Sequence, residues 1–154
     1  MKKLIVLVLA ASMLLGLAAC GAPAAEEKTV DLKALYETMT GETTEMMLVE
    51  GDTRSDFMGI QEEDCTQVIT AFAADGLLTD EIWLIEAASQ EALDRIADLA
   101  EKRMAAKAEE TVSYSPEQYA VVEKGVILKH GLYLAFLVCP QVDSLKAQFE
   151  AAFQ

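Results

Sequence analysis

Few side chains in this sequence have the type and spacing that catalysis or metal binding requires. His130 is the only histidine among 154 residues, so a histidine-based metal cluster is excluded and a Ser/His/Asp site would depend on it alone. It lies in Lys129-His130-Gly131, where a tight turn between two strands accounts for it. Ser113 and Ser115 lack the Gly-x-Ser-x-Gly context that exposes a nucleophile. We therefore predict no catalytic residue.

Metal ions and cofactors are not indicated either. The acidic run Glu62-Glu63-Asp64 lacks the spaced ligands and the central glycine of a calcium loop. The sequence contains neither a glycine-rich phosphate loop nor a Cys-x-x-Cys motif. We predict no metal site and no cofactor.

Two of the three cysteines, Cys65 and Cys139, are predicted to be free thiols. Cys139 ends an apolar run and can pack as a small buried hydrophobe. Cys65 follows Glu62, Glu63 and Asp64, whose charges disfavour a thiolate, and we expect it to be more accessible. A disulfide between the two is the alternative, because an oxidising compartment would permit one.

The third cysteine, Cys20, lies at the end of an export signal. Met1-Lys2-Lys3 is a short positive segment, and Leu4 to Ala19 is uncharged but shorter than the roughly 20 apolar residues that span a membrane. Leu17-Ala18-Ala19-Cys20 resembles the lipobox of bacterial lipoproteins. The resemblance implies cleavage before Cys20 and attachment of lipid, including palmitate, to its thiol. The alternatives are an ordinary signal peptide with a chance cysteine, or an uncleaved anchor.

This resemblance predicts three segments and a location. Residues 1–19 are a signal peptide, residues 20–30 hold the lipidated cysteine and a flexible tether, and residues 31–154 form one domain. The protein is then held by lipid at the extracytoplasmic face of the cell membrane. Loss of Lys2 and Lys3 takes the formal charge from −14 to −16. Such acidity argues against nucleic acid as a partner and fits a basic partner, a cation or a solvated surface.

Hydrophobic periodicity predicts an α+β fold. We expect an antiparallel sheet of four to five strands with helices on one face. The strands are expected at 46–50, 67–74, 81–88, 126–130 and 132–139, and the helices at 32–39, 90–109, briefly after Ser115-Pro116, and 142–153. Ile82-Trp83-Leu84-Ile85 is apolar on both faces, as in a central strand. The order strand-strand-helix occurs twice, in 67–109 and 125–153, which suggests a pseudo-repeat.

Residues 52–66 are polar and poorly patterned. We expect Phe57, Met58 and Ile60 to be the residues of this segment that point inward.

From Gly59 to Phe153 the chain resembles a domain of unknown function found in small lipoproteins of clostridia and related Firmicutes. The resemblance is carried by four short motifs: Glu81-Ile82-Trp83-Leu84-Ile85, Lys102-Arg103 at the end of the long helix, Tyr114-Ser115-Pro116-Glu117, and Gly131-Leu132-Tyr133-Leu134. Members often have Gly-Asn-Tyr where this chain has Gly131-Leu132-Tyr133. The family brings no known activity.

Arg103 and Tyr114 are the candidate ligand-binding residues that this resemblance singles out. A guanidinium matches carboxylate geometry, so the two would form an anion-recognising pair. In the alternative, Arg103 pairs with an acidic neighbour and Tyr114 packs the helix end onto the sheet.

The function that these observations favour is a non-enzymatic, membrane-anchored module that binds a protein, a peptide or an envelope component. An enzyme acting on envelope substrates and a small-solute receptor for a transporter are the alternatives. A deep apolar cleft with convergent polar groups would favour either alternative, and an exposed apolar patch would favour the binding module.

Overall fold

The computed structural model describes residues 28–154. The predicted signal peptide, Cys20 and the predicted tether up to Glu27 lie outside the described residues. Among residues 28–154, no helix has the length and apolar character needed to cross a membrane.

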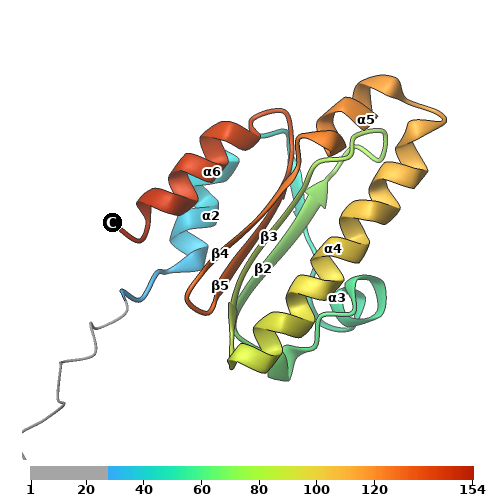
Figure 1. Cartoon of the computed structure of the whole chain (residues 1–154). Helices are drawn as coiled ribbons and strands as arrows, with labels where there is room; N and C mark the ends of the chain where they lie inside the picture. The colour runs from blue at the N-terminus through green and yellow to red at the C-terminus, as the bar shows by residue number, and fades with distance from the viewer. Residues whose placement is uncertain (1–27) are drawn as a thin grey trace, which may run out of the picture.

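A five-stranded antiparallel sheet forms the centre of the domain (Figure 1). In chain order its strands are β1 Met46–Leu48, β2 Cys65–Ala73, β3 Glu81–Ala87, β4 Val126–His130 and β5 Tyr133–Val138. Across the sheet the order is β1-β2-β3-β5-β4, and each neighbouring pair is antiparallel. The predicted α+β class and antiparallel sheet are confirmed.

Helices cover both faces of this sheet (Figure 1). One face carries α3, α4 and α5, and the other carries α2 and α6; their bounds are Gly51–Met58, Gln90–Val112, Pro116–Glu123, Leu32–Thr40 and Val142–Ala151. The prediction that helices gather on one face is wrong. Because Ile82 to Ile85 in β3 are all fully buried, each face of the sheet needs its own apolar cover.

The side chains of β3 divide between two hydrophobic cores. Trp83 and Ile85 pack toward α4, whereas Ile82 and Leu84 pack toward α2 and α6. On the α4 side, Trp83 stacks on Phe136 of β5, with ring centroids 4.7 Å apart.

The suggested repeat is present only as an order of elements. Both units, β2-β3-α4 and β4-β5-α6, have the order strand, strand, helix, but α4 and α6 lie on opposite faces of the sheet. A rotation that superposes the β2-β3 hairpin on the β4-β5 hairpin within the sheet would keep α4 on its own face, where α6 does not lie. The two units are therefore not symmetric copies.

Three helices begin where their capping residues predict. Asp31, Ser89 and Ser115 each accept backbone N–H groups at the start of α2, α4 and α5. Pro116 occupies the first turn of α5, which extends to Glu123 and is longer than the short turn we expected.

Helix α3 lies in the segment that showed no clear pattern. Its buried residues are Arg54 and Met58, one turn apart, and Ile60 beyond the helix is also buried. Phe57, expected to point inward, is 57% exposed, although its ring lies 6.2 Å from that of Phe72 on β2. Gly59 ends the helix with φ of 77°, a left-handed conformation suited to glycine.

The chain enters the domain beside the C-terminus. Lys28 Nζ donates to the Gln154 carbonyl oxygen at 2.8 Å. The Val30 N–H donates to the Tyr133 hydroxyl, and the Val30 carbonyl accepts from Gln67 Nε2. Val30 is buried in the hydrophobic core on the side of α2 and α6, so the folded part of the chain includes a residue that we assigned to the tether.

Candidate functional site

The candidate site lies where β3 and the buried face of α4, both largely apolar, end in polar residues. Glu81 is the first residue of β3 and its side chain is fully buried. On α4 the buried stripe of Leu93, Ile96, Ala97 and Ala100 continues at helical spacing with Lys107 and Thr111. The charged end of the strand and the charged end of the stripe therefore meet inside the domain.

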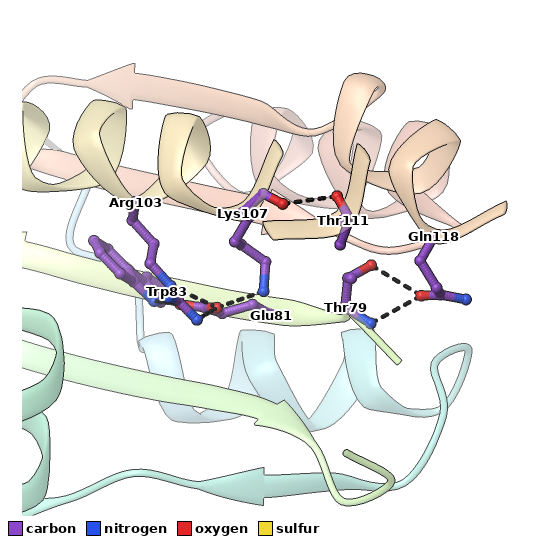
Figure 2. Close-up of polar contacts among 7 residues, drawn as sticks. All are labelled: Thr79, Glu81, Trp83, Arg103, Lys107, Thr111 and Gln118. Carbon is purple, nitrogen blue, oxygen red and sulfur yellow. Dashed lines mark hydrogen bonds and ion pairs between the residues drawn. The ribbon is translucent and has the colours of Figure 1, made fainter. Parts of the chain in front are cut away.

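Glu81 is held by three side chains (Figure 2). Arg103 Nε lies 3.1 and 3.0 Å from the two carboxylate oxygens, and Arg103 Nη2 lies 2.8 Å from Oε2. Lys107 Nζ donates to Oε2 at 2.8 Å, and Trp83 Nε1 donates to Oε1 at 2.8 Å. We call Glu81, Trp83, Arg103 and Lys107 the buried ionic cluster. Each carboxylate oxygen accepts several donors, so its lone pairs are engaged within the domain.

The electrostatics of the cluster keep Glu81 ionised. Burial raises the pKa of the Glu81 carboxyl, but the hydrogen bonds from Arg103 and the charge of Lys107 outweigh burial and lower the pKa overall. A carboxylate with a lowered pKa and engaged oxygens is poorly suited to act as a general base. The charges of the cluster are therefore paired with one another.

Asp80, the residue before Glu81, has the opposite tendency. Its side chain is buried and accepts a hydrogen bond from the Thr44 hydroxyl at 3.1 Å. Burial raises the pKa of Asp80, while the Thr44 hydrogen bond and the charge of Lys107 lower it less. Two adjacent buried carboxyl groups thus have pKa values displaced in opposite directions.

Beside the cluster, one polar contact lies within the end of α4 and two others tie α5 to the segment before β3. The Thr111 hydroxyl donates to the Lys107 carbonyl oxygen at 2.7 Å (Figure 2). Gln118 Oε1 accepts from both the backbone N–H and the hydroxyl of Thr79, at 2.9 and 3.0 Å. These bonds fix the backbone that presents the cluster.

A pocket of about 300 Å³ opens over the cluster. Glu81, Arg103 and Lys107 contribute to its lining, together with apolar side chains from β1, α3, β2 and the segment after α4; the latter are Met47, Phe57, Phe72 and Tyr114. The Arg103 guanidinium carbon lies 5.0 Å from the centre of the Phe57 ring. The pocket therefore combines paired charges with an apolar rim.

The structure brings the two predicted site residues, Arg103 and Tyr114, to this same pocket. Arg103 bonds to Glu81, as in the alternative that pairs it with an acidic neighbour. Tyr114 is 68% exposed, so it does not pack the helix end onto the sheet. The anion-recognising role of the pair stays a prediction.

Sequence reasoning did not identify Glu81, Lys107 and Phe57 as site residues. A signal existed for the first two. Glu81 directly precedes the apolar run Ile82 to Ile85, and Lys107 continues the apolar stripe of α4 in register. A charged residue in a buried register indicates a buried partner. Phe57 gave no such signal, because its helix was not recognised.

The other candidate residues lie away from the pocket. His130 ends β4, is exposed, and stacks on Phe153 with ring centroids 4.1 Å apart. Cys65 and Cys139 are free thiols, and Cys139 is the more buried, which confirms the prediction. The pKa of each thiol is raised to about 11, chiefly by burial; for Cys65 the charge of Arg54 opposes this rise and the charges of Asp64 and Glu62 add to it. Within the part of the chain that the structure describes, no group of three metal-ligating side chains is present.

The pocket and the chain entry lie at opposite ends of the sheet. The pocket surrounds Glu81, where β3 begins. The entry segment at Val30 bonds to Gln67 and Tyr133, which are the sheet partners of Glu86 near the other end of β3. Figure 1 shows this separation, with α5 at one end of the molecule and the start of α2 at the other.

The fold and the site define a class of protein: an α+β domain with a five-stranded antiparallel sheet between two helical layers and a buried ionic cluster beneath an apolar-rimmed pocket. The chain belongs to the family described as Domain of unknown function (DUF4358), whose model matches residues 39–139. This match includes all five strands and every residue that lines the pocket. Comparison with curated proteins and with solved structures found no match.

Proposed function

We propose that this protein is a lipid-anchored, extracytoplasmic binding module that uses the pocket over the buried ionic cluster to recognise a protein, a peptide or an envelope component. The observation that carries the proposal is the composition of the pocket. Its cations, Arg103 and Lys107, are paired with Glu81 beneath the surface. The large exposed side chains of the lining are apolar or aromatic, beside the single exposed carboxylate of Glu110. Such a surface favours association over chemistry.

An enzyme is less consistent with this composition. Glu81 is ionised and engaged by Trp83, Arg103 and Lys107, so it offers no free base. His130 lies outside the pocket. A small-solute receptor would need to enclose its ligand, whereas about 300 Å³ is at the low end for pockets that do so.

The predicted anchor at Cys20 fits this placement of the pocket. Cys20 precedes Lys28 by eight residues, a span of at most about 28 Å when extended. The lipid would therefore hold the Lys28 end of the domain near the membrane, and the pocket would lie at the distal end. The acidic domain would also be repelled by anionic lipid headgroups.

Nuclear magnetic resonance of methionine methyl groups tests the binding role. The lipidated chain in phosphatidylcholine nanodiscs would be titrated with two defined probes, a muropeptide and pools of random decapeptides. We expect at least one probe to shift the Met47 methyl signal, because Met47 lines the pocket, and to leave the buried Met39 unchanged.

Tyr114→Ala should weaken this response, and Leu77→Ala, an exposed apolar residue that does not line the pocket, should not. If neither probe shifts Met47, or if the shift is the same in Tyr114→Ala, the pocket is not the recognition site.

A further inference from the structure

We propose that the partner is an extended basic peptide segment that adds to the sheet beside β1 and directs apolar side chains toward the pocket. This inference rests on the proposed function and gives the partner a chemistry. Three features of the β1 edge support it: outward-facing backbone groups, exposed apolar side chains and a surrounding negative charge.

Strand β1 is an edge strand with one paired side. Its residues pair with β2 in the register Met46 to Ala73 and Leu48 to Ala71. The Glu45 carbonyl accepts from the Ala74 N–H, and the Val49 N–H donates to the Thr70 carbonyl, both at 2.8 Å. Because the bonding direction alternates along an antiparallel strand, the N–H and C=O groups of Met46 and Leu48 point away from β2. In the described part of the chain no other strand pairs with them.

The side chains at this edge are unusually apolar for a surface. Met47 and Leu48 are each 49% exposed, and Phe57 and Tyr114 are 57% and 68% exposed. Three of these four line the pocket. Side chains alternate along a strand, so every second residue of an added strand would face Met47 and Phe57.

The charge around the edge selects a basic partner. Glu45 and Glu50 flank β1, and Asp52 and Asp56 follow on α3; all four are exposed. Glu110 adds a further exposed carboxylate to the pocket lining. The cations of the lining, Arg103 and Lys107, are already paired with Glu81. A cationic peptide is therefore attracted and an acidic one repelled.

The same charges disfavour two other occupants. A second copy of this chain paired through β1 would bring its own Glu45 and Glu50 against these carboxylates. An anionic membrane surface would be repelled in the same way.

Fluorescence polarisation with designed peptides tests the inference. The lipidated chain in phosphatidylcholine nanodiscs would be titrated with a labelled peptide that alternates valine and lysine, with empty nanodiscs as the blank. Two matched peptides would be compared: one with glutamate in place of lysine, and one N-methylated on alternate residues. We expect the lysine peptide to bind, the glutamate peptide not to bind, and N-methylation to weaken binding by roughly tenfold or more, since it removes strand hydrogen bonds but keeps the side chains.

Chain variants locate the site. Met47→Lys should weaken binding of the lysine peptide, and Leu77→Lys, an equal change on the exposed turn before β3, should leave it unchanged. Glu45→Lys provides a second variant that alters no apolar contact, and it should also weaken binding. Circular dichroism melting checks that each variant is folded.

The strand-addition inference is overturned if the glutamate or N-methylated peptide binds as well as the lysine peptide, or if Leu77→Lys weakens binding as much as Met47→Lys. If the muropeptide shifts the Met47 methyl signal but no peptide binds, this inference fails and the proposed function stands. If no probe in either experiment binds, both fail.

Discussion

Replacing Glu81 by glutamine removes the one negative charge of the buried ionic cluster and changes little in shape. Arg103 and Lys107 would then lose the carboxylate that bonds to both of them; their side chains are 19% and 7% exposed. The new amide group can also accept hydrogen bonds through a single oxygen, whereas Glu81 accepts from Trp83, Arg103 and Lys107 through two.

The expected magnitude follows from this burial. Removing one partner of a buried ion pair destabilises a protein by about 3–5 kcal/mol, because the remaining charge is left uncompensated. Lys107→Met should cost less, roughly 1.5–3 kcal/mol, because Glu81 keeps Arg103 and Trp83. In the double variant Glu81→Gln with Lys107→Met, one orphaned charge is absent, so the loss should be smaller than the sum of the single losses.

Urea unfolding of residues 28–154 at pH 7 measures these differences. Trp83 is the only tryptophan of the chain and lies in the cluster, so its emission reports local loss of structure, and circular dichroism reports global unfolding. A loss below about 1 kcal/mol for Glu81→Gln, or strict additivity in the double variant, would refute the account of the cluster.

The pH dependence gives an independent check of the same reasoning. Because the folded pKa of Glu81 is lowered, its contribution to stability is complete above the ordinary glutamate pKa of about 4.3 and is lost as the pH falls through the lower folded value. The stability difference between the wild type and Glu81→Gln should therefore shrink on acidification. A difference that grows below pH 4 would contradict the sign.

Three further predictions concern other residues. Because burial raises the pKa of Asp80, its charged form costs stability at neutral pH, so Asp80→Asn should raise the free energy of unfolding at pH 7 and have little effect near pH 4; urea titrations at the two pH values measure this. Iodoacetamide at pH 7 should modify Cys65 slowly and Cys139 only after unfolding, and mass spectrometry that detects a linked peptide would disprove free thiols. Cys20→Ala should abolish palmitate labelling and leave the precursor uncleaved, and labelling of that variant would exclude lipid attachment at Cys20.

Local signals predicted most elements of the fold. The N-cap residues Asp31 and Ser89 and the apolar periods after them defined α2 and α4. The run Ile82 to Ile85 identified a central strand. That same run, apolar on both sides, was also evidence for helices on both faces, and the predicted arrangement did not use it.

The faces that α4 and α6 occupy could not be predicted from their own sequences. Each has one apolar stripe, which fits either face equally well. The side is fixed by which strand residues each helix meets, such as Trp83 for α4 and Leu84 for α6, and those contacts are tertiary.

The site was only partly predictable, because its contacts also join residues of different elements. Arg103 and Tyr114 were singled out and both line the pocket, but the partner of Arg103 is Glu81, 22 positions away on another element. Charged residues in the buried registers of β3 and α4 were visible in the sequence, but which of them pair with one another depends on tertiary contacts. Helix α3, which presents Phe57, lacked an apolar period because one of its two buried residues is Arg54.

The central claim is that the domain recognises a partner through the pocket, at the end opposite the predicted lipid anchor. Site-specific photo-crosslinking in cells that make the full chain tests it most directly, with a benzophenone side chain placed at Tyr114 beside the pocket or at Lys146 on the exposed side of α6. The account predicts a discrete adduct from position 114 that Met47→Lys abolishes, and none from position 146. No adduct from position 114, or equal adducts from both positions, would contradict it.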